Sequence, residues 1–112
     1  MSKTIHDLVI IGAGPSALTA AVYTAREDIE TLLFEKSAVG GMAAITDMID
    51  NYPGFPEGVA GYDIADKMQK QAERFGAKIE YGEVTAIRDT GKTKTITIDG
   101  NDLEARAVLI AT

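Results

Sequence analysis

A glycine-rich turn between two apolar runs near the start of the chain limits its fold more than any other feature. Residues 5–11 (IHDLVII) end in a β-branched run typical of a strand that is buried on both faces. The turn Gly12-Ala13-Gly14-Pro15 follows, and residues 16–26 carry apolar side chains at helical spacing. A second apolar run, residues 31–35 (TLLFE), comes next. Together these segments predict strand, turn, helix and parallel strand, which form one right-handed βαβ unit.

The rest of the chain changes its periodicity twice. Glycine and proline interrupt residues 36–60, so we expect mostly loop there, with one helical turn near residues 42–45. An amphipathic helix is predicted over residues 62–75, ended by Gly76. Alternating residues then predict strands at 78–81, 84–88 and 93–98, a turn at 99–101, a returning strand at 103–106 and a separate buried strand at 107–111. The predicted fold class is α/β, with an antiparallel β-meander inserted into a central parallel sheet.

Composition excludes several classes of function. The chain has 11 basic and 17 acidic residues, a net charge of −6, and no basic stripe, so we expect no nucleic-acid or anionic-lipid partner. The uncharged stretch 8–25 is broken by glycine and proline, which favours strand, turn and helix over a membrane span. No cysteine is present, which excludes thiol chemistry in these residues and makes the cytoplasm the expected compartment.

The turn has the spacing of a dinucleotide-binding motif, Gly12-x-Gly14-x-x-Ala17, with Glu35 at the end of the next strand. Gly12 permits the tight turn, Gly14 lets the backbone approach a pyrophosphate, and Ala17 lets helix and strand pack closely. The helix N-terminus offers N–H groups to the phosphates, and Glu35 is placed to accept bonds from ribose hydroxyls. The motif therefore predicts a Rossmann-like, three-layer fold that binds FAD or NAD, and the acid disfavours NADP at this site.

The motif alone leaves FAD and NAD open, because both cofactors use this turn and this acid. A dehydrogenase would normally continue with another βα unit soon after Glu35. Here a long glycine-bearing loop intervenes, including residues 36–42 (KSAVGGM) and 50–56 (DNYPGFP). Such a loop could fold over an extended cofactor, although loop spacers have a similar composition.

At these residues the chain resembles a known family, the low-molecular-weight thioredoxin reductases of the pyridine nucleotide-disulfide oxidoreductase superfamily. The resemblance runs from end to end of the chain, and residues 51–56 (NYPGFP) are its most specific part. The matching segments are residues 9–15 (VIIGAGP), 19–26 (TAAVYTAR), 40–41 (GG), 50–56 (DNYPGFP) and 106–112 (RAVLIAT).

The resemblance implies a role in FAD binding for individual residues. Residues Ala13, Gly14, Pro15 and Ser16 would contact the pyrophosphate, and Glu35 with Lys36 would hold the adenosine ribose. On the flavin side the expected residues are Gly40, Gly41 and Met42, with Asn51 near the flavin or ribityl chain. Val84 would meet the adenine through its backbone, and Ala111-Thr112 would begin a turn that closes over the cofactor.

Two residues depart from the family pattern. Met42 stands where the family usually has glutamine, and a thioether cannot donate the amide hydrogen bond, so the flavin potential could shift. Ala17 replaces the last glycine of the motif, a small change that close packing tolerates.

The larger departure is length. Family members continue into an NADPH-binding domain with a redox-active Cys-x-x-Cys and then return to complete the FAD domain. We therefore expect residues 1–112 to be the N-terminal segment of an incomplete FAD-binding domain, inactive alone.

The resemblance implies that the whole protein is an NADPH-dependent flavoprotein disulfide reductase. It would pass electrons from NADPH through FAD and a dithiol to thioredoxin or a similar disulfide protein, and it would be a homodimer. Two alternatives remain at this point: a ferredoxin–NADP reductase-type flavoprotein without the dithiol, and a non-catalytic flavin- or nucleotide-binding module.

Overall fold

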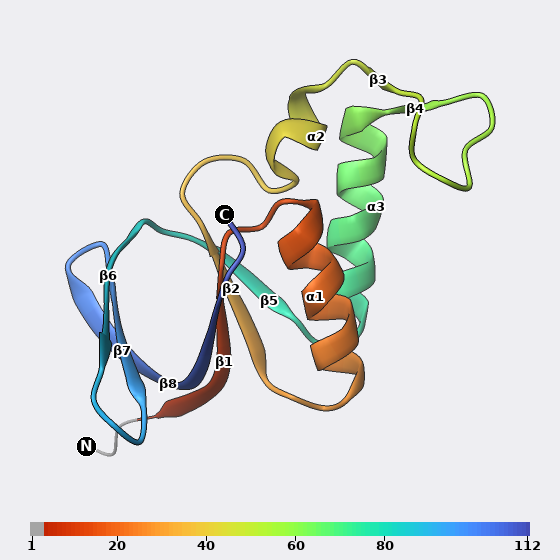
Figure 1. The fold of residues 1–112 in the computed structure, drawn as a ribbon. Helices are drawn as coiled ribbons and strands as arrows, with labels where there is room; N and C mark the ends of the chain where they lie inside the picture. The colour runs from red at the N-terminus through yellow and green to blue at the C-terminus, as the bar shows by residue number, and fades with distance from the viewer. Residues whose placement is uncertain (1–3) are drawn as a thin grey trace.

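The predicted βαβ unit forms the centre of the fold in Figure 1, a computed structural model that describes residues 4–112. Strand β1 (Ile5–Ile11) leads through the glycine turn into helix α1 (Pro15–Arg26), and β2 (Thr31–Glu35) follows. The two strands pair in parallel, in register from Leu8 opposite Thr31 to Ile11 opposite Phe34. The first part of the sequence prediction is therefore confirmed.

The remaining elements complete an α/β fold. They are α2 (Gly41–Ile45), β3 (Met48–Ile49), β4 (Val59–Ala60), α3 (Gly61–Arg74), β5 (Lys78–Tyr81), β6 (Val84–Asp89), β7 (Lys94–Ile98) and β8 (Asn101–Ile110). Six strands form one sheet in the order β5-β2-β1-β8-β7-β6, and β3 pairs with β4 separately. Strands β5, β2, β1 and β8 are parallel, and β7 pairs antiparallel with β8 on one side and with β6 on the other. Within residues 4–112, no helix is long and apolar enough to cross a membrane.

Two apolar cores hold the layers together. Helices α1 and α3 lie side by side on one face of the sheet, and the meander β6–β8 lies on the opposite side (Figure 1). The helical core contains Ile10, Leu18 and Leu33 among its buried residues. The second core joins Val9 to Ile96, and both side chains are fully buried. Because β1 is covered on both faces, consecutive side chains in its second half, residues 8–11, are apolar.

The structure corrects the prediction of two separate strands at residues 103–106 and 107–111. One strand, β8, covers both segments: it pairs with β7 from Asn101 to Ala105 and with β1 from Glu104 to Ile110. The expectation that residues 107–111 are buried is also wrong, since Leu109 is 38% and Ile110 is 66% exposed. Apolar composition indicated burial, but on this part of β8 the pairing with β7 has already ended.

Helix and turn boundaries are otherwise close to those expected. Helix α1 has Pro15 in its first turn, where the missing N–H costs little, and it ends at Arg26 as expected. Helix α3 covers Gly61–Arg74 instead of residues 62–75. Gly76 ends α3 with a φ of +107° and donates its N–H to the Glu73 carbonyl, as a terminal glycine does. The predicted turn at residues 99–101 joins β7 to β8. The two-residue strands β3 and β4 were not predicted inside the loop of residues 36–60.

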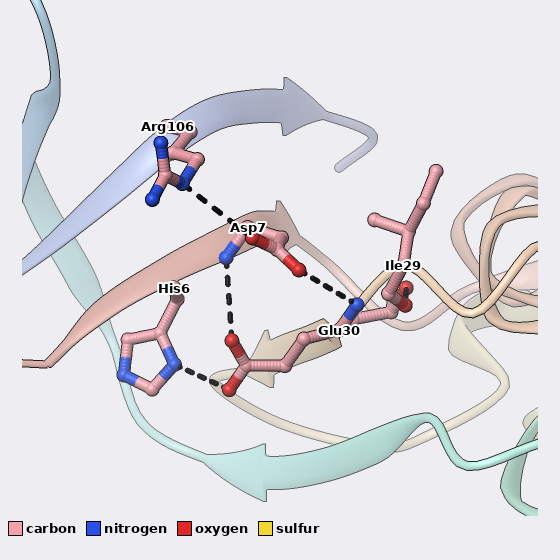
Figure 2. Close-up of polar contacts among 6 residues, drawn as sticks. His6, Asp7, Ile29, Glu30 and Arg106 are labelled. Carbon is pink, nitrogen blue, oxygen red and sulfur yellow. Dashed lines mark hydrogen bonds and ion pairs between the residues drawn. The ribbon is translucent and has the colours of Figure 1, made fainter.

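A polar network ties the start of β1 to the segment before β2 (Figure 2). The Glu30 carboxylate accepts from the Asp7 N–H at 3.3 Å and lies 2.8 Å from Nδ1 of His6. In return, the Asp7 carboxylate accepts from the Glu30 N–H at 3.3 Å, and its other oxygen lies 3.5 Å from Nε of Arg106. The hydrogen bond with His6 lowers the pKa of Glu30 below its ordinary value of 4.5.

This lowered pKa predicts a pH-dependent contribution of Glu30 to stability. A carboxyl whose pKa is lower in the folded state stabilises the fold above pH 4.5 and loses that effect as the pH falls through the folded-state pKa. We expect Glu30→Gln to lower stability at neutral pH by less than about 1 kcal/mol, because water screens half-exposed pairs. Thermal unfolding from pH 7 to 3 measures this, with Glu27→Gln as the exposed control. A deficit in Glu30→Gln that persists unchanged at pH 3 would contradict the assignment.

Candidate nucleotide-binding site

A cavity of about 460 Å³ opens at the carboxyl ends of β1, β2 and β8. This is the edge of a parallel sheet at which α/β folds bind their ligands, and the volume is in the range of small-molecule sites. Eleven of the residues singled out in the sequence line it: Gly12, Gly14, Pro15, Ser16, Glu35, Lys36, Gly41, Met42, Val84, Ala111 and Thr112. Segments far apart in the sequence are thus brought to one place.

The glycine turn forms one side of this cavity. Gly12 has a φ of +110°, which favours glycine, and its N–H donates to the Phe34 carbonyl at 2.8 Å. Gly14 precedes α1 in an extended conformation, with φ −81° and ψ −173°, and provides no side chain to cap the helix. The first turn of α1 carries no acidic residue either, so no side chain of the helix itself neutralises its positive end.

Glu35 joins the glycine turn to the end of β2. One carboxylate oxygen accepts from the Ala13 N–H at 2.9 Å, and the other accepts from the Ser37 N–H at 2.9 Å. The oxygen bonded to Ser37 N–H also accepts from the Ser37 hydroxyl at 3.4 Å, whereas the oxygen bonded to Ala13 has a second lone pair for a ligand hydroxyl. The side chain therefore lines the cavity while it holds the turn in place.

Four of the predicted site residues do not line the cavity. Ala13 and Ala17 are fully buried in the helical core, where Ala17 has the packing role expected for a small residue. Gly40 is buried behind the turn and donates its N–H to the Ala13 carbonyl at 2.7 Å. Asn51 is exposed in the segment between β3 and β4, outside the cavity lining.

Met42 and Lys36 are exposed members of the lining. Met42 is 74% exposed at the start of α2, and Lys36 follows the end of β2. The thioether offers an apolar, polarisable contact, and the ammonium adds a positive charge beside the glycine turn. The effect of Met42 on a flavin stays a prediction.

Four lining residues were missed in the sequence: Ile11, Phe34, Gly82 and Glu83. Ile11 and Phe34 could have been found, because each is near the carboxyl end of a predicted parallel strand. The connection formed by Gly82 and Glu83 carries no motif. It reaches the cavity because β5 pairs with β2, so the chain leaves β5 beside Glu35.

This arrangement is suited to an extended ligand that has an anionic middle and a sugar hydroxyl pair. The N-terminus of α1 would face the anionic middle, and the Glu35 carboxylate would accept hydrogen bonds from the sugar hydroxyls beside it. The apolar side chains of Ile11, Phe34 and Met42 offer contacts for aromatic rings. A dinucleotide combines these three chemical features.

Comparison with known proteins agrees with this geometry. The family model described as pyridine nucleotide-disulphide oxidoreductase matches residues 6–112. The thioredoxin reductase of Listeria monocytogenes is 44% identical over 110 residues, covering 98% of this chain and 34% of that protein. The thioredoxin reductase of Bacillus subtilis is 42% identical over 109 residues, covering 97% and 34%. The chain thus spans about a third of the length of these curated relatives.

Solved structures show the same fold. Lactococcus lactis thioredoxin reductase superposes with a TM-score of 0.90 at 41% identity, covering 96% of this chain and 35% of that chain. The atypical thioredoxin reductase of Desulfovibrio vulgaris gives a TM-score of 0.87, also at 41% identity, over 96% and 36%. Because the family model matches residues 6–112, nearly the whole chain, the chain belongs to the pyridine nucleotide-disulphide oxidoreductase family.

Proposed function

We propose that these residues bind FAD as part of an NADPH-dependent thioredoxin-disulfide reductase. Electrons would pass from NADPH through FAD to a dithiol outside these residues and then to thioredoxin. The observation that carries the proposal is the cavity, where the glycine turn, the free end of α1 and Glu35 meet. The family match and the names of the relatives support the same reaction.

The cavity fits the middle of FAD. A Cβ added to Gly14 would have only one atom from another segment within its contact range, the Gly41 Cα at 4.0 Å, so the backbone is open to a pyrophosphate. The N–H group of Ser16, in the first turn of α1, would then face the phosphates, because Ser16 lines the cavity. Glu35 would accept from the adenosine ribose, because its carboxylate lines the same cavity.

The ends of the cofactor are assigned by the resemblance together with the lining. The isoalloxazine ring would lie on the side of Gly41 and Met42, and the adenine would lie against Val84. Asn51 would have to approach from its exposed segment. Once bound, FAD supplies hydride acceptance and electron transfer, and the residues of this chain bind and orient it.

We further propose that residues 1–112 are an N-terminal segment of a longer FAD-binding domain. The relatives are about three times as long, which leaves room for an NADPH-binding domain and a dithiol. Among residues 4–112, β8 pairs with β7 only as far as Ala105, and the exposed Leu109 and Ile110 lie beyond that point. A further strand beside this part of β8 would cover them, and the segment alone would be inactive.

The proposed partners follow from the same family. Thioredoxin would be the disulfide substrate, the full-length protein would be a cytoplasmic homodimer, and the net charge of −6 argues against nucleic acid as a partner. Neither a ferredoxin–NADP reductase-type enzyme nor a non-catalytic module is favoured, since the most similar curated relatives reported above are named thioredoxin reductases.

The proposed reaction is tested in the full-length protein with NADPH and oxidised thioredoxin. We expect NADPH oxidation that depends on thioredoxin and a purified protein that carries FAD. A protein that holds FAD but oxidises NADPH equally fast with and without thioredoxin would contradict the proposed substrate. A protein that holds no flavin would contradict the proposed cofactor.

A further inference from the structure

We propose that Asp99 is a positioning residue for the adenosine end of FAD. Asp99 lies in the turn between β7 and β8, outside the cavity lining, yet it fixes the segment Gly82–Val84 that forms one wall. The inference rests on the proposed function, because it concerns how this cavity receives FAD. The inference gives the β6–β8 meander a role in FAD binding, a role that the glycine motif alone does not predict.

Asp99 holds both main-chain groups of Glu83. The Glu83 N–H donates to Oδ1 of Asp99 at 3.0 Å, and the Asp99 N–H donates to the Glu83 carbonyl at 3.1 Å. On the other side, the Gly82 N–H donates to the Glu35 carbonyl at 2.9 Å. The wall is thus held between the end of β2 and the β7–β8 turn.

Regular sheet pairing holds only the last residue of this wall, Val84. The ladder between β6 and β7 is irregular where Val84 pairs with Ile98 but Ala86 pairs with Thr97, so Thr85 is an extra residue. Gly82 and Glu83 precede this bulge and lie outside β6. Bulges beside binding sites redirect side chains or end the pairing, so the contacts that hold Glu83 lie outside the β6–β7 ladder. Asp99 supplies those contacts.

The wall also packs closely against the turn. A Cβ at Gly82 would lie 2.7 Å from Cγ2 of Ile98 and 3.2 Å from Oδ2 of Asp99. Asp99 and Gly100 both have positive φ, +49° and +82°, as in the tight turns that join antiparallel strands. Because the turn is tight and in contact with the wall, the position of the Asp99 carboxylate fixes where the wall can lie.

The wall lies next to the residues that would hold the adenosine. Val84 and Glu35 both line the cavity, and Gly82 is bonded to the main chain of Glu35. Removing the Asp99 side chain takes away the acceptor of the Glu83 N–H but keeps the main-chain bond from Asp99 to the Glu83 carbonyl. The peptide between Gly82 and Glu83 therefore gains freedom, and binding FAD must order it again. The expected result is weaker FAD binding without loss of the fold.

Two substitutions separate this role from turn stability. Asp99→Gly and Asp99→Asn both tolerate positive φ, but only asparagine keeps an oxygen that can accept from the Glu83 N–H. In the full-length protein, freed of flavin and titrated with FAD, we expect Asp99→Gly to weaken FAD binding about tenfold, the effect of one hydrogen bond. Asp99→Asn should stay within about twofold of the unchanged protein. The flavin-free thermal midpoint should shift by less than about 2 °C in Asp99→Gly.

Each other outcome has a distinct meaning. FAD affinity unchanged in Asp99→Gly would overturn the inference, and so would equal weakening in Asp99→Asn. A large fall in the flavin-free midpoint of Asp99→Gly would assign Asp99 to the stability of the turn instead. Failure of the unchanged protein to bind FAD would overturn the proposed function, and the variants would not be needed to see it.

Discussion

Gly12→Ala is expected to leave the full-length protein with little stable folded material. An alanine Cβ at this position would overlap the main-chain oxygen of Ala111 and lie 2.9 Å from its carbonyl carbon. Neither segment can move away easily, because Gly12 donates to Phe34 and the Ala111 N–H donates to the Ile11 carbonyl at 2.9 Å. With the additional strain of a φ of +110°, we expect a loss of more than about 3 kcal/mol.

Gly91→Ala is the matched control for this prediction. Gly91 has a nearly equal φ of +99°, but a Cβ there would meet no atom within 4 Å. It should therefore show only the conformational cost of about 1–2 kcal/mol. The thermal midpoint, followed by circular dichroism, measures both variants. Equal shifts of the thermal midpoint in the two variants would mean that the close approach of Ala111 to Gly12 adds nothing to the conformational cost.

Gly14→Ala should instead separate folding from cofactor binding. Gly14 has a negative φ, and its added Cβ would touch nothing closer than the Gly41 Cα at 4.0 Å, so the flavin-free protein should fold normally. The same Cβ would occupy the place at which the backbone approaches the pyrophosphate. We expect FAD affinity to fall by about a hundredfold or more, measured by flavin titration of the full-length protein, because a steric block cannot be relieved in a rigid turn.

The control for Gly14→Ala is the variant's own flavin-free thermal midpoint. A midpoint close to that of the unchanged protein, together with lost FAD binding, places the effect in the cavity. FAD bound as tightly as in the unchanged protein would exclude a pyrophosphate beside Gly14. A large fall in the flavin-free thermal midpoint would show that the added Cβ at Gly14 clashes within the turn itself.

The part of the fold that could be predicted depends on local rules. The glycine turn specifies a βα junction by the conformations that it permits, and Gly76 ends α3 because its positive φ suits a terminal glycine. The β7–β8 turn follows from Asp99 and Gly100 in the same way. In each case a few adjacent residues determine the backbone, so no tertiary contact needs to be known.

The errors arise where distant segments decide the structure. Residues 101–110 form one strand because β1 and β7 pair with overlapping halves of it, which its own sequence does not reveal. Its apolar end is partly exposed because burial depends on neighbours, and hydropathy alone does not provide them. Likewise, β3 and β4 are each two residues long, too short for a periodic pattern.

The residues of the candidate site also fall into two groups, those that a local motif identifies and those that distant pairing brings to the cavity. The glycines and Glu35 were identifiable because their chemistry is concentrated in a motif of adjacent elements. The wall that contains Gly82 and Glu83 forms only after β5 pairs with β2. Asp99 contacts it only once the meander has folded back. Sequence spacing cannot reveal such a contact, because it joins residues 83 and 99 through a hairpin whose register is set by a bulge.

The most direct test of the central claim is a crystal structure of the full-length protein with bound FAD. The account predicts the pyrophosphate beside Gly14 and the first turn of α1, with a ribose hydroxyl within hydrogen-bond distance of Glu35. The adenine should lie along the wall formed by Gly82–Val84. FAD located elsewhere, with this cavity filled only by solvent, would contradict the assignment of the site.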